Sequence, residues 1–195
     1  MYGYRDFVVA PIGERYNNVK RVYNKELILN TEIYNHQYVN RLAKVIATPL
    51  LFQSPINVGD EVIVHHNVFR RWHDIKGREK NSRSYWKDNT YIVSLDQIYL
   101  YKKENWKAMP GYSLIKPIKS DNSFSFEKEK SLIGVVKYSD GFLNTNDLVG
   151  FRPNMQCEDF INGERLYRIM NKFITIKYEY QGNEEEYNPS WAESS

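Results

Sequence analysis

Hydrophobic residues alternate with other residues over short stretches of the chain, and no stretch sustains a helical spacing. After the turn signal Gly-Asp, Val62 and Val64 alternate with Glu61, Ile63 and His65. Ile98 and Leu100 alternate with two tyrosines. A period of two is typical of β-strands, and the 16 tyrosines also favour strands. The pattern predicts an all-β fold of short strands and turns, of the type found in small, partly open β-barrels.

Four of these segments recur in a second copy, in the same order. The matched blocks are 7–12 with 113–118, 41–47 with 131–137, 57–67 with 144–154, and 91–101 with 166–176. The third pair aligns Asp60 with Asp147 and Asn67 with Asn154. Each match is weak by itself, but four in one order indicate a diverged repeat. The sequence therefore predicts two tandem barrels, at 1–103 and 104–180, and a solvated polar tail at 181–195.

The copies differ between their first and second blocks, where the first copy is roughly twice as long. The extra length is a polar segment at about 13–40 that holds the aliphatic triplet Leu27, Ile28 and Leu29. A loop of this length is usually functional or disordered, and exposed aliphatic residues need a partner or the protein's own body to cover them. Two interpretations stay open: the triplet docks on a partner, or it is an ordinary strand packed on the barrel.

Several segments of the first copy resemble the GroES family of co-chaperonins. They are D-F-V-V-A-P-I at 6–12, the triplet in the long loop, R-L-A-K-V-I-A-T-P at 41–49, V-G-D-E-V-I-V at 58–64 and D-Q-I-Y-L-Y at 96–101. The resemblance covers about residues 6–102, with a weaker copy over about 111–178. Three features depart from the family pattern: Lys25-Glu26 replaces a glycine pair, Arg41 replaces a glycine, and Pro49–Pro55 does not resemble the roof hairpin.

The resemblance implies two GroES-like β-barrels and a non-enzymatic function. Leu27, Ile28 and Leu29 would be the partner-binding residues that attach this protein to a GroEL-type chaperonin ring during ATP-dependent protein folding. The chaperonin would bind the ATP, so we expect no cofactor on this chain. A homo-oligomeric ring, with a heptamer as one candidate, would bind through several such loops at once. The alternative is a structural virion protein of a capsid or tail, and the Asn, Lys and Tyr bias fits a bacteriophage origin.

Candidate catalytic and metal-binding residues are sparse. His65 and His66 would point to opposite faces of a strand, and neither His36 nor His73 stands at a ligand spacing, so we expect no metal site. Cys157 is the single cysteine, which fits a reducing compartment, and we expect it to be buried or half-buried. The chain has no nucleotide-binding or hydrolase motif, so we expect no catalytic residues.

The charge of the chain gives little reason to expect nucleic acid as a partner. The net charge is +3 at pH 7, and basic residues are interspersed with acids. The segment Arg70–Lys87 combines basic residues with Trp72 and Trp86, which can bind single strands, but Asp74 and Glu79 interrupt it. We therefore expect a solvated hairpin here. The chain has no apolar stretch of membrane-spanning length and no signal-peptide pattern, which predicts a cytoplasmic protein, or a virion component in the alternative.

Overall fold

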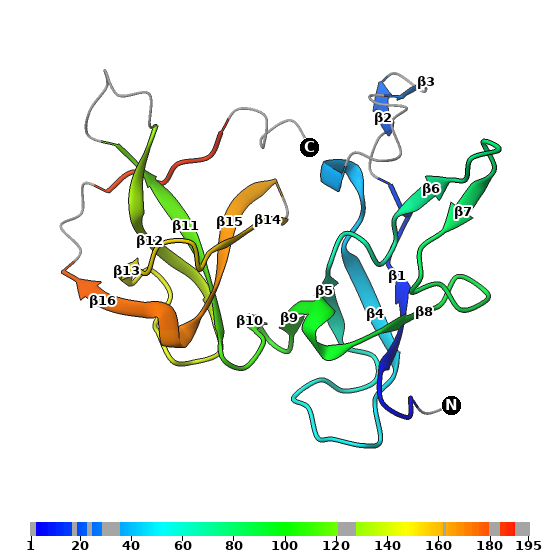
Figure 1. Ribbon diagram of the computed structural model, residues 1–195, viewed down its shortest axis with the longest axis horizontal. Helices are drawn as coiled ribbons and strands as arrows, with labels where there is room; N and C mark the ends of the chain where they lie inside the picture. The colour runs from blue at the N-terminus through cyan, green and yellow to red at the C-terminus, as the bar shows by residue number, and fades with distance from the viewer. Residues whose placement is uncertain are drawn as a thin grey trace. The chain divides into compact units, whose positions relative to one another are not determined.

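The computed structural model describes residues 3–16, 19–22, 25–28, 36–120, 128–161, 163–179 and 184–189. The chain divides into two compact units, residues 1–105 and 106–194 (Figure 1). Within these residues the regular elements are strands paired antiparallel and three single-turn 3₁₀ helices, so the predicted all-β fold is confirmed. No helix in the described part of the chain is long and apolar enough to cross a membrane.

Unit 1 is built on one antiparallel sheet with the strand order β9-β5-β4-β1-β8. Its strands are β1 (Phe7–Pro11), β4 (Leu42–Ala47), β5 (Glu61–Val64), β8 (Tyr91–Val93) and β9 (Ile98–Lys102). Two hairpins form separate sheets, β2 (Val19–Val22) with β3 (Lys25–Ile28) and β6 (Arg71–His73) with β7 (Glu79–Asn81). The 3₁₀ turns η1 (His36–Tyr38) and η2 (Leu95–Gln97) precede β4 and β9.

The alternation seen in the sequence sets the core of unit 1. On β4 the side chains of Ala43, Val45 and Ala47 are buried, and the residues between them are more exposed. Phe69, in the turn before β6, packs edge-on against Tyr91 of β8 with ring centroids 4.8 Å apart. Aromatic pairs in this geometry stabilise a core beyond the area that they bury. Phe69 therefore fixes the chain that leads into the β6–β7 hairpin onto the sheet.

Unit 2 is built on a sheet with the strand order β14-β15-β11-β12-β13-β16. The elements of the unit are β10 (Trp106–Ala108), β11 (Tyr112–Lys119), β12 (Glu129–Ser139), β13 (Leu148–Phe151), β14 (Cys157–Ile161), β15 (Glu164–Met170), η3 (Asn171–Phe173) and β16 (Ile174–Tyr178). The main core cluster takes alternate residues from four strands, namely Ile115, Val136, Val149, Phe151, Tyr167 and Ile169. A smaller cluster around Ile118 and Val135 lies on the other face of the same strands.

The two units share one strand order. The series β8-β1-β4-β5-β9 in unit 1 corresponds to β15-β11-β12-β13-β16 in unit 2. Register agrees as well, because Val9 pairs with Val45 across β1 and β4 as Ile115 pairs with Val136 across β11 and β12. The chain therefore contains two copies of one five-stranded arrangement, and unit 2 adds β14 at its edge.

Two of the four sequence matches are displaced by one residue relative to the strand pairing. The sequence aligned Leu42 with Leu132, but Leu42 pairs with Ile63 as Ile133 pairs with Gly150. The fourth block is displaced in the same way, by one residue. A shift of one residue exchanges the two faces of a strand, so these two matches were wrong in detail although the strands themselves correspond.

Asp60 and Asp147, which the sequence aligned, hold the same turn in the two units. Each carboxylate accepts the N–H of the residue three positions earlier, Asn57 at 2.7 Å and Asn144 at 3.1 Å. Each aspartate carbonyl also accepts an N–H from the strand β4 or β12, at 2.9 Å in both units. The residue before each aspartate has a positive φ, as a glycine in unit 1 and an asparagine in unit 2, and these residue types tolerate that conformation best.

The described part of the C-terminal segment, residues 184–189, is bound to unit 2, whereas we expected it to be solvated. The Lys119 N–H donates to the Glu185 carbonyl and the Tyr187 N–H donates to the Pro117 carbonyl, both at 2.8 Å. The side chain of Asn188 makes further hydrogen bonds at the β14–β15 turn. This binding has a cause in the pairing of β11, because β15 pairs only with the first half of β11. The C-terminal segment takes up the backbone groups that remain.

Candidate functional site: the insertion and its base

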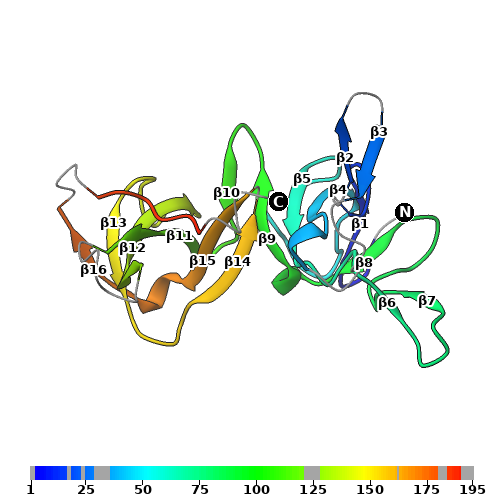
Figure 2. The ribbon, with the colours of Figure 1, turned by 90° about the horizontal axis from the view of Figure 1, so that it is seen from above.

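The aliphatic triplet lies in a hairpin within the insertion between β1 and β4. Leu27 and Ile28 are on β3, where they pair with Lys20 and Val19 of β2, and Leu29 lies outside the described residues. Among the described residues, β2 and β3 pair only with each other and form their own two-stranded sheet. Figure 2 shows this hairpin extending away from the sheet of unit 1. The segment is thus a strand, as one interpretation expected, but it is not a strand of the main sheet.

The two ends of the insertion are held together at its base. Tyr16 and Val39 form an isolated antiparallel bridge and both side chains are buried. Asn40, 7% exposed, donates from Nδ2 to the carbonyls of Ile12 at 2.8 Å and Glu14 at 2.7 Å. Its own N–H donates to the Arg15 carbonyl at 2.9 Å. The chain therefore leaves and re-enters unit 1 at one fixed point, which we call the clamp (residues 12–16 and 39–42).

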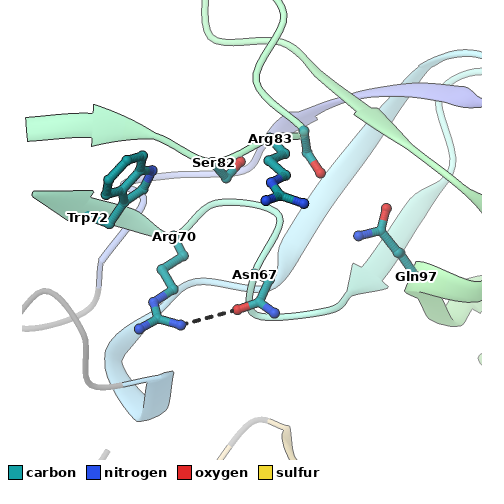
Figure 3. A pocket seen from close by; sticks show the side chains of 7 residues that line it. Asn67, Arg70, Trp72, Ser82, Arg83 and Gln97 are labelled. Carbon is teal, nitrogen blue, oxygen red and sulfur yellow. Dashed lines mark hydrogen bonds between the residues drawn. The ribbon is translucent and has the colours of Figure 1, made fainter. Parts of the chain in front are cut away.

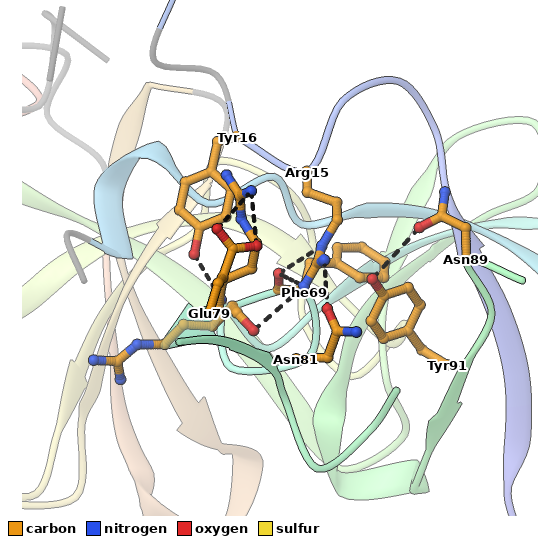
Figure 4. A network of polar contacts seen from close by, with 9 residues as sticks. Arg15, Tyr16, Phe69, Glu79, Asn81, Asn89 and Tyr91 are labelled. Atoms are coloured by element: carbon orange, nitrogen blue, oxygen red, sulfur yellow. Dashed lines mark hydrogen bonds and ion pairs between the residues drawn. The ribbon is translucent and has the colours of Figure 1, made fainter. Parts of the chain in front are cut away.

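Arg15 links the clamp to the core and to the β6–β7 hairpin (Figure 4). Its Nε and Nη2 donate to the Phe69 carbonyl at 3.1 and 2.8 Å, and Nη1 donates to Asn81 Oδ1 at 2.8 Å. The guanidinium also lies 5.5 Å from the centroid of the Tyr91 ring, a cation–π arrangement. One side chain therefore orients the first end of the insertion against the edge of the core.

Tyr16 makes a second link between the clamp and the same hairpin. Its hydroxyl accepts the Arg71 N–H at 2.7 Å, and the Arg71 guanidinium lies 4.7 Å from the centroid of its ring. Arg71 is itself paired with Glu79 across β6 and β7 at 3.1 Å. The insertion and the β6–β7 hairpin are thus mechanically connected through the clamp, although they are separate sheets.

Three histidines gather beside the clamp, although their spacing along the sequence does not indicate a cluster. The ring centroids of His65 and His66 are 4.1 Å apart, and those of His36 and His66 are 5.2 Å apart. His65 and His66 do not point to opposite faces because β5 ends at Val64 and the chain turns there. Burial, and then the neighbouring His65 and Arg41, lower the pKa of His66 to about 3. His66 is therefore neutral at physiological pH.

The described residues show no site of metal chemistry. No group of three or more His, Cys, Asp or Glu side chains among them is arranged to hold a metal ion. Cys157 is exposed on β14, which corrects the expectation of a buried or half-buried residue. It is the first residue of β14, which is the outermost strand of the sheet among the described residues.

Comparisons of the chain with known proteins give no relative from which a function can be transferred. No protein-family model matches the chain, and neither the curated proteins nor the solved structures compared with it gave a match. The resemblance to the GroES family therefore rests on the sequence blocks and on the placement of the insertion.

Proposed function

We propose that this protein is a co-chaperonin, a non-enzymatic lid that binds a GroEL-type chaperonin ring through the β2–β3 hairpin. The observation that carries the proposal is the placement of Leu27 and Ile28 on a strand outside the main sheet, in an insertion closed by the clamp. The same connection in unit 2 spans only residues 120–128, between β11 and β12. The insertion is thus an addition to a strand arrangement that forms without it.

A hairpin of this kind suits a protein that must both attach and release. An isolated two-stranded hairpin is marginally stable in water, and burying one Leu or Ile side chain on a partner stabilises a complex by about 1.5–3 kcal/mol. Ordering the insertion offsets much of that gain, and the clamp reduces the cost because both ends are already fixed. A single hairpin binds weakly, whereas a homo-oligomeric ring that presents several hairpins binds tightly through effective concentration.

The decisive experiment is co-migration of the full chain with a GroEL-type chaperonin on a sizing column, with and without ADP. The wild-type protein is expected to co-migrate only in the presence of nucleotide. Leu27→Asp is expected to abolish co-migration because a carboxylate cannot enter an apolar pocket on the partner. The hairpin itself is expected to persist, since the backbone pairing of Leu27 with Lys20 across β2 and β3 does not depend on the residue 27 side chain.

Leu50→Asp is the matched control, because Leu50 is 63% exposed in another loop of unit 1. This variant is expected to co-migrate like the wild type. If Leu27→Asp co-migrates as well, the hairpin is not the docking element. If the wild-type chain never binds a chaperonin and instead assembles alone or is found in purified viral particles, the protein is a structural virion component.

A further inference from the structure

A second candidate site of unit 1 lies beside the β6–β7 hairpin and has no part in the proposed docking. It is an open pocket of about 510 Å³, lined mainly by Asn67, Arg70, Trp72, Arg83 and Gln97. Figure 3 shows these side chains around one opening. A pocket of this size can hold a small-molecule ligand or one residue of a polymer.

Two guanidinium groups, those of Arg70 and Arg83, line the pocket. Arg83 is exposed and makes no hydrogen bond or ion pair with any residue that the structure describes. Arg70 contributes a second guanidinium, whose Nη1 lies 3.5 Å from Asn67 Oδ1. No acidic residue is among those that line the pocket. Because guanidinium groups present several N–H donors in a planar fork that matches phosphate oxygens, the site suits a phosphate group.

The two acids of the Arg70–Lys87 segment are engaged elsewhere. Glu79 pairs with Arg71 at 3.1 Å, and Asp74 accepts two backbone N–H groups of its own turn at 2.9 Å. The segment contains seven basic and two acidic residues, a net charge of +5, whereas the whole chain carries +3. The small net charge of the chain therefore conceals a local concentration of positive charge at this hairpin, which raises the attraction for anions.

Trp72 supplies an aromatic surface at the same opening. Its side chain is 45% exposed, and its Nε1 donates to the Asn81 carbonyl at 3.0 Å, which fixes the orientation of the indole. Figure 3 shows the indole at one side of the opening, next to the arginines. A fixed, exposed indole is a platform on which a nucleobase can stack.

We propose that this pocket binds a nucleotide unit, with its phosphate on Arg70 and Arg83 and its base stacked on Trp72. Gln97 Oε1 accepts the Ser94 N–H at 3.3 Å, so its amide nitrogen is left as a donor for the sugar or the base edge. The ligand is either a free nucleotide or one residue of a single-stranded nucleic acid, since both present a phosphate beside a base.

The test is fluorescence anisotropy of a labelled oligothymidylate with the full-length protein at low salt, with thymidine monophosphate as the competitor. Binding is expected, and Arg83→Gln should weaken it severalfold and reduce the slope of log K against log salt by about 0.7, the value for one phosphate contact on a single strand. Trp72→Ala should weaken it by about 5- to 150-fold, the range of one lost stacking contact, whereas Trp72→Phe should retain most of the affinity.

Arg78→Gln is the charge-matched control, because Arg78 lies exposed on the same hairpin and does not line the pocket. It should leave the affinity nearly unchanged. Displacement of the oligonucleotide by thymidine monophosphate would identify a free nucleotide as the ligand. Failure of the monophosphate to compete would identify single-stranded nucleic acid as the ligand. Equal losses for Arg83→Gln and Arg78→Gln would reduce the effect to general charge attraction and overturn the proposal, as would the absence of binding by the wild-type protein.

Discussion

Replacing Asn40 by alanine should loosen the clamp without touching the hairpin that the insertion carries. The Asn40 side chain donates to the carbonyls of Ile12 and Glu14 at 2.8 and 2.7 Å and accepts the Leu42 N–H at 2.9 Å. One net hydrogen bond stabilises a protein by about 0.5–1.5 kcal/mol, and buried groups left unpaired add to the loss. Asn40→Ala should therefore lower the free energy of unfolding of unit 1 by roughly 2–4 kcal/mol.

Native-state hydrogen exchange is the suitable assay because it reports each unit separately. The amides of Asn40 and Leu42, which donate to Arg15 and to the Asn40 side chain, should lose protection in the variant. The amides of unit 2 are the internal control and should keep their rates. Asn40→Asp tests the two Nδ2 hydrogen bonds with a side chain of the same shape, because it replaces the Nδ2 donor by a carboxylate oxygen that faces the Ile12 and Glu14 carbonyls. A loss below about 0.5 kcal/mol, the scale of an ordinary surface substitution, would refute the account of the clamp.

Three further results are expected. The pKa of His66 is lowered to about 3 in the folded state, so as the pH falls the unfolded chain takes up a proton on His66 before the folded chain does. The free energy of unfolding should therefore fall as pH drops from about 6.5 towards 3. His66→Asn should flatten this dependence in urea titrations, and an unchanged slope would contradict the lowered pKa of His66. Gly134→Ala should destabilise unit 2 by about 1–3 kcal/mol in urea titrations, because the added Cβ would overlap the Lys116 carbonyl. The equivalent position in unit 1 is occupied by Ala43. A neutral effect of Gly134→Ala would show that strands β11 and β12 can separate enough to accept the Cβ. Exposed Cys157 should react stoichiometrically with a maleimide without denaturant, and labelling only in urea would show that the thiol is covered.

The sequence was sufficient to predict the all-β fold and the internal repeat, because both depend on short-range signals. The Gly-Asp turn before β5 and its counterpart Asn146-Asp147 stand in the same hydrogen-bonded turn. The register of two blocks could not be read from the pattern. In β9 four consecutive residues, Ile98 to Tyr101, are all buried, so the alternation gives no phase by which to align the strand.

The candidate sites depended on contacts between residues far apart in the chain. The sequence singled out Leu27 and Ile28 as residues of a long polar loop, but their place in a separate hairpin follows from the pairing with β2. The histidine cluster and the arginine pocket were missed because their members come from separate segments, such as Asn67, Arg83 and Gln97. The sequence also could not show that Asp74 and Glu79, which interrupt the basic segment, are both engaged within their own hairpin.

The bridge between Tyr16 and Val39 has a consequence for how this protein can change over evolutionary time. A loop whose ends are fixed costs little more when it lengthens, about 0.6 kcal/mol for each doubling of its length. Substitutions and insertions between these two residues therefore place little burden on the folding of unit 1. Under the proposed docking, selection can alter what the insertion binds while the rest of the unit stays constant, so partner preference would diverge faster than the fold.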